Sequence, residues 1–115
     1  MSSYCPRRGD VVWLQFNPQA GHEQAGHWPA IILSPESYNR TTGLAIVCPM
    51  STQEKGYPFE VHIPEGLKVA GVILSDQIKN MDWKNRRAKF CCALPSYMVW
   101  EVLRKFNTLL TTNPS

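Results

Sequence analysis

Short apolar runs, each bounded by glycine, proline or asparagine, follow one another along most of the chain. Breaks at intervals of about ten residues are typical of all-β proteins built from short strands. The runs that predict strands are residues 11–16, 29–33, 44–49, 59–63, 71–74 and 77–81. Their number and spacing favour a barrel or a sandwich over alternating strands and helices.

Two of these runs have informative patterns. Residues 29–33 (PAIIL) are continuously apolar, a pattern that suits a central strand. Residues 59–63 (FEVHI) alternate apolar and polar side chains, so we expect one face of that strand to be solvated.

Two segments predict helices. Residues 35–39 form a short one, which Ser34 is placed to cap and in which Pro35 suits the first position. Near the C-terminus, apolar side chains recur at steps of three and four residues: Met98, Val99, Val102, Leu103, Phe106, Leu109 and Leu110. This stripe predicts an amphipathic helix of about four turns that packs on the core. Pro95 suits its first turn, and Ser96 is a candidate cap.

The length of 115 residues is typical of one domain, and we expect residues 1–115 to form a single unit. Residues 111–115 are polar and are expected to fray. Apolar residues make up 43% of the chain and charged residues 18%, which excludes a wholly disordered protein. The N-terminus lacks the apolar segment of a secretory signal, and no apolar run approaches a membrane span in length.

Cysteine and histidine are the residues that would indicate a disulfide framework or a metal site. They are Cys5, Cys48, Cys91, Cys92, His22, His27 and His62. No C-x-x-C pair is present, and glycines beside His22 and His27 indicate a loop, so we expect no zinc site and no cofactor. An even cysteine count permits two disulfides, but small buried thiols in a reducing cytoplasm are favoured at this length.

The net charge of +3 permits a nucleic-acid partner without requiring one. A basic segment nevertheless stands out, with the cations Lys79, Lys84, Arg86, Arg87 and Lys89. Trp83 and Phe90 lie among these cations, and such interleaved aromatic rings can stack on bases. The alternative for a charge run of this kind is an ordinary solvated face.

The glycine-bracketed segment 21–27 is the densest polar stretch of the chain. It contains Glu23 and Gln24, and a carboxylate on a loop over a barrel can act as a general base. Composition alone favours the alternative, a solvated hairpin loop. The segment therefore provides a candidate base that needs support from elsewhere in the chain.

Two further loops carry groups that can meet phosphate oxygens or base edges. In the segment 50–59 these are Ser51, Thr52, Gln53 and Lys55. After the strand predicted at 71–74, Asp76 and Gln77 lie where a strand ends. An ordinary turn, capped in the second case by the Asp side chain, is the alternative at both places.

Taken in order, several motifs resemble those of the MazF toxins in the MazF/PemK family. They are GDVVW from Gly9, FNP from Phe16, GHEQAGH from Gly21, PAIILSP from Pro29, YN at Tyr38, TQEKGYPFE from Thr52, GVIL from Gly71 and DQ at Asp76. The resemblance runs from Arg8 to Leu110, with the family's order and spacing. A chance match of this extent is improbable.

The resemblance implies a mainly β fold, an SH3-like barrel of short antiparallel strands with a C-terminal α-helix, assembled as a symmetric homodimer. It implies a bacterial, cytoplasmic mRNA interferase: a sequence-specific, ribosome-independent endoribonuclease toxin of a type II toxin–antitoxin system. Such enzymes need no metal. The RNA 2′-hydroxyl attacks the adjacent phosphate, leaving a 2′,3′-cyclic phosphate. The partners implied are single-stranded RNA and a MazE-like antitoxin with an acidic, disordered tail.

The resemblance also assigns roles to individual residues. Glu23 matches the loop glutamate that serves as acid or base, and Ser51 stands where relatives have a threonine hydroxyl. The RNA-binding group that we infer comprises Gln24, Thr52, Gln53, Lys55, Asp76, Gln77 and Lys79.

Trp28 departs from the pattern, because the family has arginine before the Pro-Ala strand. The indole N–H is one neutral donor, whereas arginine donates two charged hydrogen bonds to phosphate. By its position, Trp28 belongs to the catalytic group, and four interpretations of it are open. Either it is a natural variant whose charge comes from Arg86 or Arg87, or it is an engineered change. Alternatively, it is a stacking platform for a base, or it marks a weakened protein that binds RNA or antitoxin without cutting. A gyrase-directed toxin of the CcdB type is a third hypothesis, which the motifs disfavour.

Overall fold

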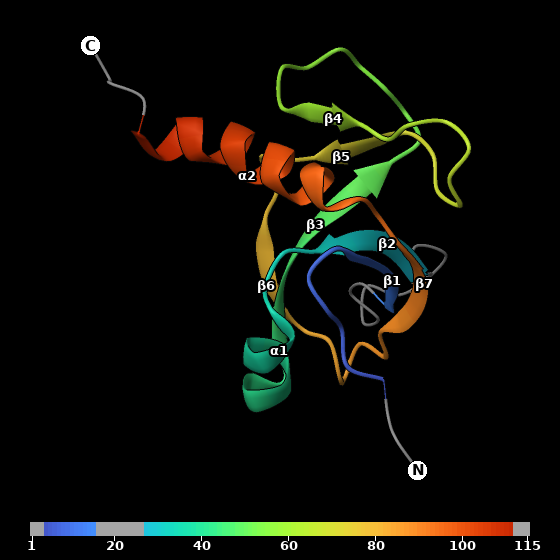
Figure 1. Ribbon diagram of the computed structural model, residues 1–115, viewed down its shortest axis with the longest axis vertical. Helices are drawn as coiled ribbons and strands as arrows, with labels where there is room; N and C mark the ends of the chain where they lie inside the picture. The colour runs from blue at the N-terminus through green and yellow to red at the C-terminus, as the bar shows by residue number, and fades with distance from the viewer. Residues whose placement is uncertain (1–3, 16–26, 112–115) are drawn as a thin grey trace.

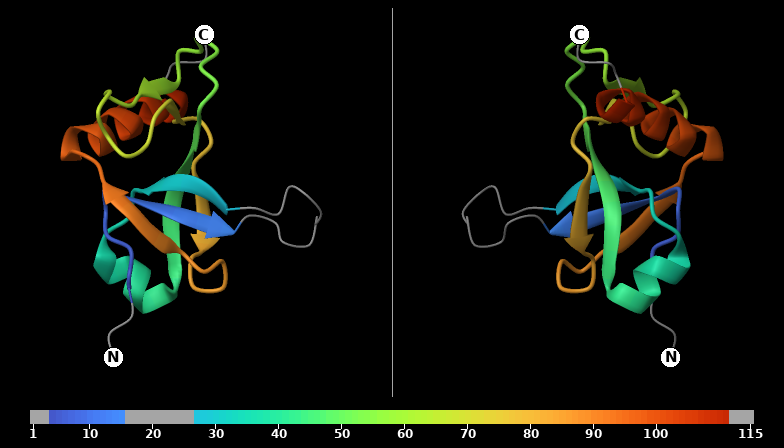
Figure 2. Two further views of the ribbon diagram at one scale, coloured as in Figure 1. Left: turned by 90° about the vertical axis from the view of Figure 1, so that its right-hand side faces the viewer. Right: turned by 90° about the vertical axis from the view of Figure 1, so that its left-hand side faces the viewer.

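The computed structural model describes residues 4–15 and 27–111, which form a seven-stranded sheet and two helices (Figure 1). In chain order the elements are β1 (Asp10–Gln15), β2 (His27–Ile32), α1 (Glu36–Thr42), β3 (Leu44–Ser51), β4 (Glu60–His62), β5 (Val72–Leu74), β6 (Lys79–Asp82), β7 (Lys89–Ala93) and α2 (Ser96–Thr111). The two helices lie at opposite ends of a strongly bent sheet (Figures 1 and 2). No helix in the described ranges is long and apolar enough to cross a membrane.

Every strand pairing is antiparallel, in the order β4-β5-β3-β2-β1-β7, with β6 also paired to β3. The long strand β3 joins two parts of the sheet, since residues 44–47 pair with β6 and residues 50–51 pair with β5. The last residue of β3, Ser51, is therefore carried into the small ribbon formed by β4 and β5. This architecture confirms the expected β fold with a C-terminal helix.

Apolar side chains on both faces of the sheet build two core clusters. Val11, Ile31 and Cys48 face α2, whereas their neighbours Val12 and Ile32 face the second cluster. The second cluster also contains Leu14, Ala30, Ala45, Val47, Met81 and Trp83. Strands β1, β2 and β3 are thus buried on both sides, because each contributes alternate residues to a different cluster. The central position predicted for the run at 29–33 is confirmed, since β2 lies between β3 and β1.

The first half of α2 packs on the sheet, and the second half extends past it (Figure 1). Met98, Val99 and Val102 are buried against the sheet, which confirms the predicted core contact. Leu109 and Leu110, which belong to the same stripe, are 48% and 68% exposed. The amphipathic pattern therefore predicted the helix correctly but overestimated how much of it is covered.

Several local predictions were wrong. The strand β7 was missed because its sequence, KFCCA, starts with a cation and has no alternation. Pro35 is itself the N-cap of α1, and Ser34 does not cap that helix. Ser96 belongs to α2 rather than preceding it, and Thr111, expected in the tail, is the last residue of that helix.

Strand β4 also departs from prediction, because its polar face is not open to solvent. Glu60 is 5% exposed and belongs to the buried set, although His62 is exposed as expected. The FEVHI alternation was therefore misleading at one of its two polar positions. A carboxylate is buried only where hydrogen-bond donors replace water, so Glu60 must have structural partners.

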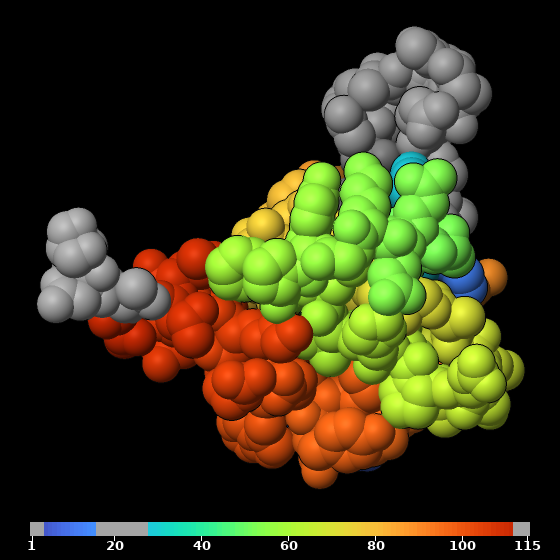
Figure 3. Space-filling model, turned by 90° about the horizontal axis from the view of Figure 1, so that it is seen from above, coloured from blue at the N-terminus to red at the C-terminus, as the bar shows by residue number. Residues whose placement is uncertain are grey.

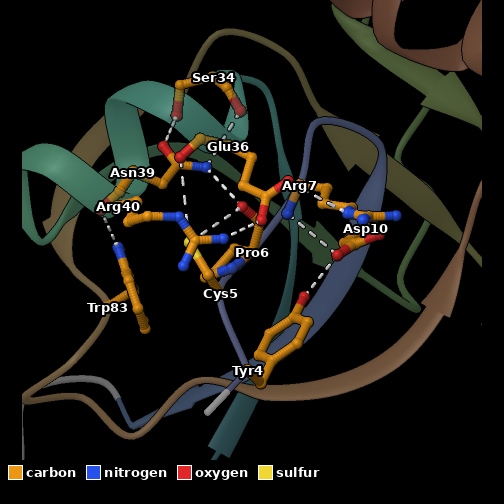
Figure 4. Close-up of polar contacts among 10 residues, drawn as sticks. All are labelled: Tyr4, Cys5, Pro6, Arg7, Asp10, Ser34, Glu36, Asn39, Arg40 and Trp83. Atoms are coloured by element: carbon orange, nitrogen blue, oxygen red, sulfur yellow. Dashed lines mark hydrogen bonds and ion pairs between the residues drawn. The ribbon is translucent and has the colours of Figure 1, made fainter. Parts of the chain in front are cut away.

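A buried polar network holds the N-terminal segment, α1 and the segment after β6 together (Figure 4). The fully buried Asn39 donates through Nδ2 to the carbonyls of Pro6 and Ser34, at 2.9 and 3.1 Å. The Asn39 carbonyl accepts from the indole Nε1 of Trp83 at 3.0 Å. Trp83 is thereby fixed in the core, so the idea that it stacks on bases is wrong.

The cysteines are free thiols. Cys5 and Cys48 are buried, and Cys91 and Cys92 are half-buried against the α2-side cluster. A register shift between Val11 and Val12 leaves Cys91 as an extra residue in β7. Burial raises the pKa of the Cys48 thiol to about 12, and the Asp76 charge adds to the effect.

Candidate nucleic-acid interface

Three adjoining cavities meet at Ser51, at the end of β3. The largest has a volume of about 530 Å³, and the other two of about 280 and 170 Å³. We call this combined depression the groove. Its lining includes Trp13, Trp28, Ser51, Thr52, Gln53, Lys55, Tyr57, Glu60, Lys68, Asp76, Gln77 and Lys79.

The groove gathers most of the site residues predicted from sequence. Trp28 comes from β2, Ser51 from β3 and Lys79 from β6, and the loops after β3 and β5 add the rest. The loop residues are Thr52, Gln53, Lys55, Asp76 and Gln77. Glu23 and Gln24 lie outside the described residues, in the segment that precedes β2.

The backbone at Ser51 is fixed by its neighbours. Its hydroxyl oxygen accepts a hydrogen bond from the backbone N–H of Gln53 at 3.0 Å. On the other side, Gly71 has a φ of +106°, and a Cβ there would lie 2.1 Å from the Ser51 carbonyl oxygen and 2.9 Å from Thr52 Cα. Only glycine fits this contact, so Gly71 allows β5 to approach the residues at the centre of the groove.

The loop that carries Lys55 is held from inside the protein. The buried Glu60 carboxylate accepts the backbone N–H groups of Lys55 and Gly56, each at 3.0 Å. From α2, the Lys105 ammonium donates to the carbonyls of Pro58 and Glu60, each at 2.9 Å. Neither Glu60 nor Lys105 was predicted as a site residue. Glu60 is a polar position of the alternating FEVHI run, and Lys105 lies off the apolar stripe of the C-terminal helix.

The corner that carries Asp76 and Gln77 is tied to the same loop. The buried Ser75 donates its hydroxyl and its backbone N–H to the carbonyl of Phe59, the latter at 3.1 Å. The Leu74 carbonyl accepts from the backbone N–H of Gln77 at 3.0 Å and from the Cys48 thiol at 2.9 Å. The two polar loops are therefore parts of one hydrogen-bonded assembly.

Positive charge in the groove comes from three separate segments, through Lys55, Lys68 and Lys79. Lys68, in the loop between β4 and β5, was not predicted, and it lines the same cavity as Trp28 and Ser51. Sequence reasoning missed it because a single lysine in a polar loop carries no motif. Trp28 is 45% exposed there, so one face of its ring is available for stacking.

The remaining cations of the basic segment do not line these cavities. Arg86 donates to the carbonyl of Gln15 at 3.1 Å, and the Lys84 ammonium lies 5.9 Å from the centre of the Trp83 ring. Phe90, which was expected near bases, packs against Tyr4 with ring centres 5.7 Å apart. Of the predicted basic cluster, only Lys79 contributes to the groove.

No group of three or more His, Cys, Asp or Glu side chains within residues 4–15 and 27–111 is arranged to hold a metal ion. The groove instead offers two aliphatic hydroxyls, two amides, three ammonium groups, the Asp76 carboxylate and two exposed aromatic rings, Trp28 and Tyr57. Ammonium and hydroxyl groups suit phosphate oxygens, and exposed rings suit unpaired bases. The chemistry of the groove therefore fits single-stranded nucleic acid.

Comparison with known proteins identifies relatives over nearly the whole chain. A family model described as PemK-like, MazF-like toxin of type II toxin-antitoxin system matches residues 7–110. The endoribonuclease toxin MazF of Escherichia coli K12 is 49% identical over 88 residues, which cover 76% of this chain and 78% of that protein. The endoribonuclease PemK of Escherichia coli is 33% identical over 108 residues, covering 90% and 81% of the two chains.

Solved structures agree with this relationship. MazF from Deinococcus radiodurans superposes with a TM-score of 0.85 at 48% identity, covering 94% of this chain and 98% of that one. A MazE–MazF complex from the same organism also gives a TM-score of 0.85, at 40% identity over 96% and 100% of the two chains. Sequence and fold thus lead to one conclusion: the chain belongs to the PemK-like, MazF-like toxins of type II toxin–antitoxin systems.

Proposed function

We propose that this protein is a sequence-specific endoribonuclease toxin that cuts single-stranded RNA without a metal ion. One observation carries the proposal: polar and cationic residues from four separate segments converge on one groove centred on Ser51. The similarity to proteins named endoribonucleases supports the reaction class. The unpaired bases of a single strand can stack on exposed aromatic rings and offer free Watson–Crick edges. A single strand therefore suits this groove better than a duplex does.

The proposed reaction is an attack of the RNA 2′-hydroxyl on the adjacent phosphate. The bond from O2′ to phosphorus forms as the bond from phosphorus to O5′ breaks, which leaves a 2′,3′-cyclic phosphate and a 5′-hydroxyl. Glu23 serves as acid or base for these proton transfers. The Ser51 hydroxyl donates to a phosphate oxygen, and nearby lysines stabilise the charge that builds up on the phosphorane. Thr52, Gln53, Asp76 and Gln77 hold the flanking nucleotides.

Incubation of the purified protein with a long single-stranded RNA in EDTA tests this proposal. We expect discrete fragments whose 5′ ends accept phosphate from polynucleotide kinase, because those ends carry free hydroxyls. Ser51→Ala should reduce the rate by about 10² to 10³, the effect of removing one oxyanion donor. Lys84→Ala, a cation outside the groove, is the matched control and should cut normally. RNA that stays intact in EDTA would contradict the proposal.

A second candidate is a protein of the same family that binds RNA or antitoxin without cutting, and Trp28 is the observation that favours it. Trp28 lines the largest cavity of the groove, where its indole can donate only one neutral hydrogen bond. Tight RNA binding without product, even at high protein concentration and long incubation, would support this candidate. Cleavage gained by Trp28→Arg would then show that the rest of the groove remains competent.

We further propose a homodimer that acts in the bacterial cytoplasm and is inhibited by a MazE-like antitoxin. The exposed Tyr97 and Trp100 on α2, at 59% and 56%, are large apolar side chains of the kind that interfaces bury. A basic groove also suits an acidic antitoxin tail. Sedimentation equilibrium should give a mass of two chains, and a single-chain mass at micromolar concentration would contradict the dimer.

A further inference from the structure

We propose that Glu60 and Lys105 are positioning residues for the groove: together they fix the backbone of the loop at residues 55–60, so that Lys55 and Tyr57 face the RNA. The inference rests on the proposed function. It concerns two side chains, one buried beneath the loop and one on the C-terminal helix. Neither residue needs to touch the phosphate that is cut.

The Glu60 carboxylate is the inner half of this arrangement. It is 5% exposed, and its two oxygens accept separate backbone N–H groups, from Lys55 and Gly56, at 3.0 Å each. The backbone of Glu60 turns back as well, since its N–H donates to the Tyr57 carbonyl at 3.1 Å. A buried carboxylate with two backbone donors defines the path of the loop more strictly than a solvated turn does.

Lys105 supplies the outer half from a distant part of the chain. Its ammonium bridges the carbonyls of Pro58 and Glu60, at 2.9 Å each. Figure 3 shows the segment after β3, in green, lying directly against α2, in red. The contact links the groove to the part of α2 that follows its buried residues, Met98, Val99 and Val102.

The position of the loop determines what the groove presents. Lys55, Tyr57 and Glu60 line one cavity of the groove together with Asp76 and Gln77. The carbonyl of Phe59, between the two held positions, also accepts from Ser75, the residue before Asp76. A change in the loop would therefore move the Lys55 ammonium and the Asp76 corner relative to each other.

Two substitutions separate this role from general folding. Glu60→Gln keeps the shape of the side chain but leaves one oxygen acceptor where two N–H groups need partners. Lys105→Met keeps the stem and removes the ammonium. Lys105→Arg should restore the bridge. Arg104→Met is the matched control, because Arg104 donates to the half-exposed Glu101 carboxylate on the same helix.

Amide hydrogen exchange in the free protein tests whether the two residues hold the loop. We expect the N–H groups of Lys55 and Gly56 to exchange about tenfold faster in Glu60→Gln, the factor that matches one lost hydrogen bond. Lys105→Met should speed exchange at the N–H of Glu60, and Arg104→Met should not. Unchanged exchange in both test variants would overturn the inference, whatever the protein does to RNA.

Binding and cleavage of a single-stranded oligonucleotide test whether the held loop serves the groove. Both test variants should raise KM about tenfold with little change in kcat, because they weaken a binding contact and leave the reacting groups in place. In a background that combines Lys55→Met with Tyr57→Ala, Glu60→Gln should add less than about twofold, since both contacts through which it acts are gone. Faster exchange with an unchanged KM would overturn the positioning role.

The same experiment keeps the two proposals apart. A parent protein that neither binds nor cuts RNA would contradict the proposed function, whereas the exchange data would still decide whether Glu60 and Lys105 hold the loop. A parent protein that cuts RNA, with variants that lose activity only by lowering the melting temperature, would leave the proposed function intact and overturn this inference.

Discussion

Trp28 shows how one side chain sets the character of the groove. Its side chain is 45% exposed in a cavity that also contains the Ser51 and Thr52 hydroxyls, the Gln53 amide and the Lys68 ammonium group. A neutral indole cannot neutralise a phosphate, and the charge must come from another residue. Within the described part of the chain, Lys68 is the only cation that lines this cavity.

Lys68→Ala is therefore expected to weaken RNA binding, because it removes the cation that lines the largest cavity of the groove. The slope of log affinity against log salt should fall in magnitude by about 0.7, the value for one phosphate contact to a single strand. Titrations of a fluorescent oligonucleotide at several salt concentrations measure this slope. Lys84→Ala is the control, since Lys84 lies over the Trp83 ring outside the groove. Equal slopes in Lys68→Ala and the parent protein would contradict the assignment.

Strand β3 is the element that organises the groove. Its pairing with β2 runs to Pro49, and the strand then ends at Ser51, which is paired with Val72 of β5. That pairing depends on Gly71, whose missing side chain lets the two backbones approach. A loop glycine is thus a packing residue for the end of the strand that lines the groove.

Gly71→Ala should displace the end of β3 and reduce both stability and RNA cleavage. A Cβ 2.1 Å from the Ser51 carbonyl forces the backbones apart, and we expect a cost of about 2–4 kcal/mol from overpacking and the left-handed conformation together. Gly66→Ala is the matched control, because Gly66 has a similar φ of +92° but no atom within 4 Å of the added Cβ. It should cost only about 1 kcal/mol. Urea unfolding measures both, and equal losses would show that contact with Ser51 is unimportant.

At the scale of the whole molecule, the fold turns a modest net charge into a local one. The total is only +3, yet the loops after β3 and β4 and the strand β6 bring three lysines to one depression. The corner behind this depression is anchored in the core by the Cys48 thiol, which donates to the Leu74 carbonyl at 2.9 Å. Groove and core are therefore coupled through a buried titratable group.

This coupling predicts an alkaline loss of stability. Because the folded-state pKa of Cys48 is raised from 9.0 to about 12, its contribution is fully present below pH 9 and is lost as pH rises toward 12. The loss should amount to about 1.4 kcal/mol for each pH unit above 9. Cys48→Ala should be less stable than the parent at pH 7, with a smaller gap at pH 10. Urea unfolding at both pH values measures the gap, and a constant gap would contradict the predicted linkage.

Sequence patterns predicted six of the seven strands and α2, but they missed β7. Patterns failed where a single polar residue is buried. Glu60 has the spacing of a solvated position, yet its burial depends on two N–H groups that come from a loop. Trp83 lies among cations in the sequence, as a base-stacking residue would. In the structure, however, its indole N–H donates to the buried carbonyl of Asn39. Hydrogen-bond partners distant in the sequence decided both cases.

The sequence by itself determined the family, the β architecture and most of the residues expected at the groove, because motif order and hydrophobic spacing are properties of a linear chain. Only the tertiary structure decided which cations share the groove, since Lys55, Lys68 and Lys79 meet through strand pairing while Arg86 is turned to a carbonyl of β1. It also revealed Gly71, Glu60 and Lys105, whose roles depend on close contacts between segments that are separate in the chain. Spatial proximity of this kind is set by packing and hydrogen bonding, and no local pattern records it.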